Sequence, residues 1–294
     1  MSIESRLLPV VAITGTSILV GCGGYSGGSC GSYGSYGSYG TFGAARTHAH
    51  AARAASAAPT TPTAPTTPTG GPYAGCGVPT SVGADGIYEG TLANKATQQE
   101  NPVVAIIADN GDGRMSGQDG TYYRFNVDTA GNNVAGSFFG YSQGASFPNG
   151  GQSTSGSLSA VITLPGLNGA LTDQAGDVEA LLLNFDNVYN LPSALPTLVG
   201  SWNYSANGFS LTATIQADGV FSAIDSNGCS YTGAFGLIDA NFNAYSESYI
   251  RSCKGSSMTF TGLASYFPAT SIAPAEIKLL ADDNAGDYLV ADLK

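Results

Sequence analysis

The segment 209–215 reads Phe209-Ser210-Leu211-Thr212-Ala213-Thr214-Ile215, with an apolar side chain at every second position. This period of two is typical of a β-strand with one buried face, because successive side chains of a strand point to opposite faces. Further strand-like runs occur at 103–107 and 122–127, and helical spacing is almost absent before Ala175. The sequence therefore predicts an all-β fold.

Turn signals separate the strand-like runs. Dipeptides of Asn or Asp followed by Gly suit tight hairpin turns, which join antiparallel strands. The segment 178–189 is ambiguous, since its apolar spacing also suits a helix face. We favour a strand there, because its counterpart 288–291 reads as one. The turn dipeptides are Asn110-Gly111, Asp112-Gly113, Asp119-Gly120, Asp218-Gly219 and Asn227-Gly228.

The body of the chain repeats itself. Asp173-Gln174-Ala175-Gly176-Asp177 matches Asp283-Asn284-Ala285-Gly286-Asp287, and Gly86-Ile87-Tyr88 aligns with Gly200-Ser201-Trp202. Such self-similarity at a nearly constant offset indicates a duplicated unit. We predict two tandem antiparallel lobes, each a β-sandwich or a small β-barrel, over residues 77–190 and 191–294. A proline-containing connector at 189–196 joins them.

The segment 22–76 has a different composition. It contains Gly-Ser-Tyr repeats, and then prolines at every third position from Pro59 to Pro68 with Thr and Ala between them. Such a composition buries too little apolar area to offset chain entropy, and a proline period of three matches the polyproline II turn. We expect a disordered, partly stiff tether ahead of the lobes.

The first 21 residues have the parts of a secretory signal. A short polar start with Arg6 precedes an apolar run from Leu7 to Val20, which is too short for a comfortable transmembrane span. The run ends in Leu19-Val20-Gly21-Cys22. This segment resembles the lipobox of bacterial lipoproteins, although no family motif is matched in the rest of the chain.

The resemblance implies a lipid anchor. In the family, the peptidase would cut after Gly21, and Cys22 would carry a diacylglycerol and usually an acyl chain on its new amine, such as palmitate. Gly23 stands where an Asp would favour retention in the inner membrane. We therefore expect a lipoprotein of the outer membrane, with the side that the lobes face left open. A chance cysteine after an ordinary secretory signal is the alternative.

Charge and histidine content exclude several functions. The formal net charge is −11, which argues against nucleic acid as a partner, because nucleic acid is itself a polyanion. No histidine occurs from Gly77 onward, so a Ser-His-Asp triad and a His-ligated zinc are excluded there. We therefore expect no catalytic residue, no cofactor and no enzyme activity. A carboxylate pair remains possible among Glu89, Glu100, Glu179, Glu247 and Glu276.

Four cysteines remain besides Cys22. An exported chain meets an oxidising compartment, where disulfides are the default. Cys229 follows the Asn227-Gly228 turn and Cys253 lies on the next expected hairpin, so we predict a bond between them. A bond between Cys30 and Cys76 is a weaker prediction.

Two features are weaker candidate sites. Asp109 and Asp112 flank a Gly-containing turn, but they lack the ligand spacing of a calcium loop, so we expect a hairpin and no metal. Aromatic residues beside the loop 140–156 resemble a recognition surface, with packing in the sheet core as the alternative. The partner-binding candidates are Tyr122, Phe138, Phe139, Tyr141 and Phe147.

Three functions fit these observations. The leading hypothesis is a non-enzymatic binding or adhesion module, anchored to the outer membrane, for a protein or glycan partner. The second is an envelope inhibitor or immunity protein against a lysozyme-like enzyme or a toxin, acting through the loop 140–156. The third is a glycoside hydrolase with a carboxylate pair.

Overall fold

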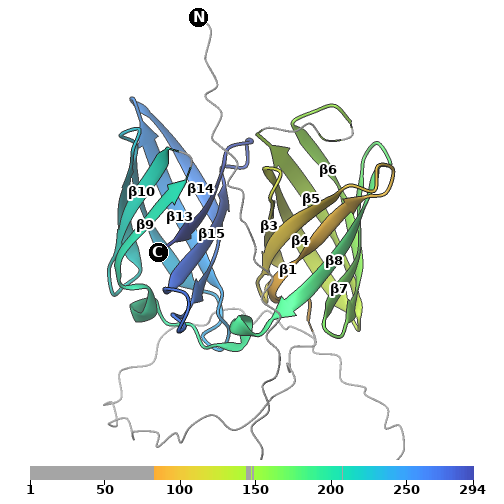
Figure 1. Cartoon of the computed structure of the whole chain (residues 1–294), viewed down its shortest axis with the longest axis horizontal. Coiled ribbons are helices and arrows are strands. Elements are labelled where there is room, and N and C mark those ends of the chain that lie inside the picture. Colours follow the sequence, from red (N-terminus) through yellow and green to blue (C-terminus); the bar gives the residue numbers. More distant parts are fainter. Residues whose placement is uncertain (1–82, 144–146, 148, 207) are drawn as a thin grey trace, which may run out of the picture. The chain divides into compact units, whose positions relative to one another are not determined.

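The computed structural model describes residues 83–294 apart from 144–146, 148 and 207. Within these residues the chain forms sixteen β-strands and two short 3₁₀ helices. The prediction of an all-β fold with two tandem antiparallel lobes is confirmed, and both lobes are barrel-like sheets of eight strands (Figure 1). The expected signal peptide and tether, with Cys22, Cys30 and Cys76, lie outside the described residues.

The first sheet is a closed barrel, since β1 pairs with β8 as well as with β2. Every strand is antiparallel to its neighbours in chain order. Apolar residues on the inner faces fill the interior, among them Tyr123 and Phe125 from one strand. The strands are β1 (Gly86–Asn94), β2 (Glu100–Ile107), β3 (Asp112–Gly117), β4 (Thr121–Ala130), β5 (Asn133–Ser142), β6 (Ser153–Thr163), β7 (Gly166–Asp173) and β8 (Val178–Asp186).

The second sheet has the same number and order of strands. Its first and last strands meet at one backbone pair, Asn203 and Lys294, whose N–H groups each donate to the other's carbonyl at 2.7 and 2.8 Å. The strands are β9 (Gly200–Ala206), β10 (Phe209–Ile215), β11 (Val220–Asp225), β12 (Ser230–Leu237), β13 (Tyr245–Cys253), β14 (Ser256–Phe267), β15 (Glu276–Asp282) and β16 (Tyr288–Leu293).

Strand β10 shows why these segments fold as they do. Phe209, Leu211, Ala213 and Ile215 are all buried in the core of the second barrel, and the three polar residues between them are exposed. The alternation in sequence is thus the alternation between core and solvent. The ambiguous segment 178–189 is a strand up to Asp186, as we predicted, and its end belongs to a short 3₁₀ helix; its counterpart in the second copy is also a strand, so the two are β8 and β16.

Matching turns support the duplication. Between β7 and β8, Oδ1 of Asp173 accepts hydrogen bonds from the backbone N–H groups of Ala175 and Asp177, both at 2.9 Å. Between β15 and β16, Oδ1 of Asp283 accepts from the corresponding Ala285 and Asp287 at 2.8 and 3.0 Å. The same aspartate therefore closes the same hairpin in each barrel.

The predicted disulfide is confirmed. Cys229 lies immediately before β12 and Cys253 ends β13, and their Cα atoms are 4.5 Å apart. The bond continues the ladder, because the next pair along it is Ser230 with Ser252. Among the residues that the structure describes, no helix is both long and apolar enough to cross a membrane.

The two barrels share a third apolar cluster. The chain passes from β8 to β9 through the 3₁₀ helices η1 (Asn187–Asn190) and η2 (Leu195–Leu198). Tyr189 of η1 is fully buried and stacks on Phe242, with ring centroids 5.0 Å apart. The cluster joins residues such as Ile106 of the first barrel to Leu263 and Leu280 of the second. It therefore packs the outer face of one barrel on the outer face of the other.

Candidate functional site

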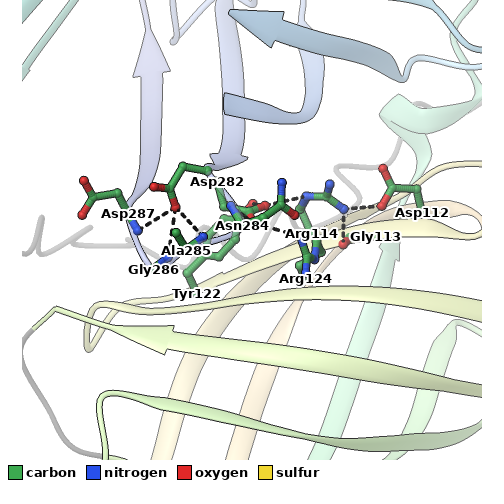
Figure 2. A network of polar contacts seen from close by, with 11 residues as sticks. Asp112, Gly113, Arg114, Tyr122, Arg124, Asp282, Asn284, Ala285, Gly286 and Asp287 are labelled. Atoms are coloured by element: carbon green, nitrogen blue, oxygen red, sulfur yellow. Dashed lines mark hydrogen bonds and ion pairs between the residues drawn. The ribbon is translucent and has the colours of Figure 1, made fainter. Parts of the chain in front are cut away.

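A network of charged side chains adjoins this apolar cluster (Figure 2). Its centre is Asp282, which ends β15 and has no exposed surface. Its carboxylate accepts a hydrogen bond from the Tyr122 hydroxyl at 3.2 Å. It also forms ion pairs with Arg114 Nε at 3.3 Å and with Arg124 Nη1 at 3.4 Å. Asp282 therefore links the second barrel to three side chains of the first.

The register of β3 and β4 places the two arginines together. Arg114 lies opposite Arg124 across this pair of strands, on the outer face of the first barrel. Arg114 also donates to the Asp112 carboxylate and to the Gly113 carbonyl. Two cationic groups side by side are stable here because the carboxylates of Asp112 and Asp282 balance them.

Tyr122 contributes a neutral donor to the network. Burial raises the pKa of its hydroxyl well above the ordinary value of 10.0. The group therefore stays protonated and can donate to the Asp282 carboxylate. Its ring stacks on Tyr288 of β16, with centroids 5.0 Å apart, so apolar and polar contacts coincide at this residue.

A hollow of about 440 Å³ opens beside the network, between β3 and the strands β12, β13 and β14. We call it the inter-barrel hollow. Its floor is the row of backbone pairs Phe235–Glu247–Gly262, and the outward side chains beside this row that line the hollow are small. The lining residues are Asp112, Arg114, Ala234, Phe235, Gly236, Ser246, Glu247, Ser248, Thr261 and Gly262.

Glu247 lies behind the floor of the hollow. It occupies the same face of β13 as Tyr245 and Tyr249, which belong to the core of the second barrel. Neither of its carboxyl oxygens has a hydrogen-bond partner. Burial raises the pKa of Glu247 from 4.5 to about 8, against the opposing influence of Arg114. Glu247 is therefore mainly protonated and uncharged at neutral pH.

Four of the five candidate partner-binding aromatics are in apolar packing. Phe138 and Phe147 belong to the core of the first barrel, and Tyr122 and Tyr141 belong to the cluster between the barrels. The alternative of packing in the sheet core is therefore correct for Phe138 and Phe147, whereas Tyr122 and Tyr141 are buried between the barrels. Phe139 alone is exposed, at 48%, and the Arg124 guanidinium lies 5.3 Å from its ring centroid. A partner-binding role stays a prediction for Phe139.

The candidate metal residues belong to a hairpin turn between β2 and β3. The N–H of Ala108 donates to the Asp112 carbonyl, and Gly111 has a left-handed φ of 82°. The Asp112 carboxylate is bonded to Arg114. Within the described part of the chain, no group of three or more His, Cys, Asp or Glu side chains is arranged to hold a metal ion.

Asp112, Tyr122 and Glu247 were named from the sequence in separate roles, but the sequence did not bring them together into this site. Arg114 and Asp282 are far apart in the chain, and no local pattern links them. The sequence does indicate that Glu247 is buried, because Glu247 is the charged residue in the alternating inward series Tyr245, Glu247, Tyr249. A single acidic residue on the core face of a strand indicates a buried carboxyl group.

Comparisons with known proteins give no relative. No family model, no curated protein and no solved structure matches this chain.

Proposed function

We propose that this protein is a lipoprotein of the outer membrane, anchored through Cys22, that acts as a non-enzymatic binding module for a protein or glycan partner. The inter-barrel hollow is its binding site. The observation that carries the proposal is the hollow itself, an indentation of about 440 Å³ with polar groups from both barrels around it.

The hollow is built for binding without rearrangement. Its walls are paired strands, and its Arg114 side chain is held by Asp112, Gly113 and Asp282. The Ser246 hydroxyl is oriented by a hydrogen bond to the Gly236 carbonyl at 3.3 Å. Polar groups that are already fixed lose little conformational entropy when a ligand arrives, so more of the contact energy is available as affinity.

The contacts of the acidic residues favour binding over hydrolysis. A glycosidase needs two carboxyl groups that reach the substrate. Both oxygens of Glu247 are buried, and Asp112 is paired with Arg114. Elsewhere, Glu276 pairs with Lys278 and Lys294. We therefore assign the site to recognition alone.

The test uses the complete chain carrying Cys22→Ser. We expect this variant to be recovered without detergent, whereas the unaltered protein sediments with membranes. The soluble variant is then titrated onto outer-membrane vesicles and, separately, onto murein sacculi. Saturable binding is expected, and Ser246→Trp should weaken it by at least about tenfold, because the indole occupies part of the hollow and blocks the ligand.

The matched control is Ser222→Trp, which places the same ring at an exposed position of β11 outside the hollow. It should leave binding unchanged, and both variants should keep the melting temperature of the parent chain. Equal binding by the two tryptophan variants would contradict the hollow as the site. Sedimentation of the Cys22→Ser chain with membranes would contradict the anchor.

A further inference from the structure

We infer that the ligand of the inter-barrel hollow is an uncharged, polyhydroxylated group, that is, a neutral sugar unit of a glycan. The inference rests on the proposed function and narrows its ligand to one chemical class. Three observations carry it: the balance of charge in the hollow, the hydroxyl groups that line it, and the uncharged surface that extends from its floor.

The charges at the hollow cancel. Arg114 and Arg124 are matched by Asp112 and Asp282 through ion pairs. An anionic ligand would have to draw Arg114 away from two carboxylates, and a cationic ligand would have to separate Asp112 from Arg114. Both exchanges break an existing ion pair, so neither an anionic nor a cationic ligand gains much binding free energy there.

The exposed lining can still form hydrogen bonds. Ser246, Ser248 and Thr261 present hydroxyl groups on the outer faces of β13 and β14, and each hydroxyl both donates and accepts. The Asp112 side chain is 36% exposed, and its carboxylate accepts hydrogen bonds only. Donors and acceptors without net charge match the hydroxyl groups of a sugar, each of which also does both.

The surface of the second barrel around the hollow is also uncharged and rich in hydroxyl groups. The six strands β9 to β14 contain three charged residues, Asp225, Glu247 and Arg251. All three lie in the inward register: Asp225 pairs with Leu211, Glu247 with Phe235, and Arg251 with Tyr231. The outward positions of these strands are uncharged and rich in Ser and Thr. A neutral glycan can therefore extend beyond the hollow without meeting a charged side chain.

The size of the hollow fits this ligand class. Sites for small molecules have volumes of about 300–1,000 Å³, and the hollow lies within this range. The outward residues that the second barrel contributes to the lining are Ala, Gly, Ser and Thr, and Phe235, the aromatic residue of the lining, belongs to the barrel core, so its ring does not offer an apolar anchor pocket of the kind used at protein–protein interfaces. The lining therefore favours a sugar over a protein side chain.

The test is calorimetric titration of the complete Cys22→Ser chain with three trisaccharides that differ in charge, after a screen of uncharged oligosaccharides for the best ring type. For a gluco-configured sugar the set is N-acetylglucosamine trimer, its cationic deacetylated form, and an anionic β-1,4-linked glucuronate trimer, which keeps the ring configuration and the linkage. The uncharged ligand should bind at least about tenfold more tightly than either charged one. Its affinity should change less than about twofold between about 0.05 and 0.5 M NaCl, since no charge is screened.

Ser248→Trp should abolish this binding, and Ser222→Trp should preserve it. If a charged trisaccharide binds best and Ser248→Trp abolishes that binding, the hollow is the site but the ligand class is wrong. If no uncharged oligosaccharide binds while envelope binding still depends on Ser246, the sugar inference fails and the proposed function stands. If the uncharged sugar binds and Ser248→Trp does not weaken it, the sugar binds outside the hollow and the inference is wrong, while the proposed function is decided separately by envelope binding of Ser246→Trp.

Discussion

Glu247 is a carboxyl group inside an apolar barrel, with no hydrogen-bond partner for either oxygen. A buried carboxyl group without hydrogen bonds costs stability even when it is neutral, and it costs far more when it is ionised. Burial does keep it uncharged over most of the physiological range, since its pKa is raised to about 8. The tyrosine hydroxyl next on the same inward face, that of Tyr249, also has no hydrogen-bond partner.

This pKa predicts how stability depends on pH. The folded chain holds the Glu247 proton up to about pH 8, whereas the unfolded chain releases it near the ordinary value of 4.5. The folded state therefore binds more protons between these values, and its free energy of unfolding falls as pH rises from about 4.5 to about 8. Glu247→Gln cannot ionise, so this part of the slope should disappear.

The measurement is urea unfolding at about pH 5, 7 and 9, comparing the parent chain with Glu247→Gln and with Glu89→Gln. Glu89 is an exposed residue of β1 and serves as the control. The free energy of unfolding of Glu247→Gln should increase relative to that of the parent chain as pH rises. A parallel pH dependence in all three proteins would show that Glu247 does not titrate in this way.

The glycines of the turn dipeptides show where local sequence rules predict the structure and where they fail. Asn-Gly and Asp-Gly dipeptides predicted turns, and Gly111, Gly120, Gly219 and Gly228 do take positive φ angles. Asp112-Gly113 is different, because both residues belong to β3. A Cβ on Gly113 would lie 2.1 Å from the Phe125 ring, so this glycine makes room for a core side chain. Packing against a distant residue cannot be read from a dipeptide.

At the scale of elements, alternation of apolar and polar residues predicted the strands and their antiparallel order. It worked because each barrel buries one face of every strand, which leaves a period of two in the sequence. The neighbouring positions of Cys229 and Cys253 followed from the same hairpin order. The alternation did not predict that the sheets close into barrels, since a β-sandwich has the same alternation. Whether a sheet forms a barrel or a sandwich depends on whether its first and last strands meet.

The disulfide should stabilise the second barrel. Cys229 and Cys253 close a loop with a sequence separation of 24, and cross-linking a loop of this size restricts the unfolded chain. The double variant Cys229→Ala/Cys253→Ala should lower the free energy of unfolding by about 2–4 kcal/mol. Urea unfolding of the oxidised parent, the reduced parent and the variant measures this.

Peptide mapping without reductant provides the control, because it must find the two cysteines joined in the parent chain. Reduction should destabilise the parent and leave the double variant unchanged. Free thiols at both positions in the purified protein would contradict the bond.

At the scale of the molecule, the contacts between the barrels combine an apolar cluster with the Asp282 network. Neither was predictable from sequence, because Arg114 and Asp282 come together only when the outer faces of two finished barrels pack. The sequence at the outward positions of the strands has no periodic pattern that indicates which of these positions the other barrel will cover. The candidate site lies at this contact, which is why sequence reasoning found the fold and missed the site.

Asp282→Ala tests the contribution of the network. The substitution removes the central carboxylate from the buried Arg114 and the half-buried Arg124, and breaking a buried pair such as Asp282 with Arg114 costs about 3–5 kcal/mol. The free energy of unfolding, measured in urea, should fall by that amount. Asp287→Ala, in the adjacent turn and exposed, should stay within about 0.5 kcal/mol of the parent. Equal effects of the two substitutions would show that the network does not stabilise the fold.

Closure of the first barrel has a mechanical consequence. Strand β1 is hydrogen-bonded along both edges, to β2 on one side and to β8 on the other. Under the proposed anchoring at Cys22, tension from a bound partner would reach the folded part at the N-terminal end of β1. A load along β1 shears the hydrogen bonds to both β2 and β8 at once. Many backbone hydrogen bonds must therefore break together instead of one after another. The same pairing that completes the barrel thus gives the N-terminal end of the fold a resistance to pulling that a strand at an open sheet edge lacks.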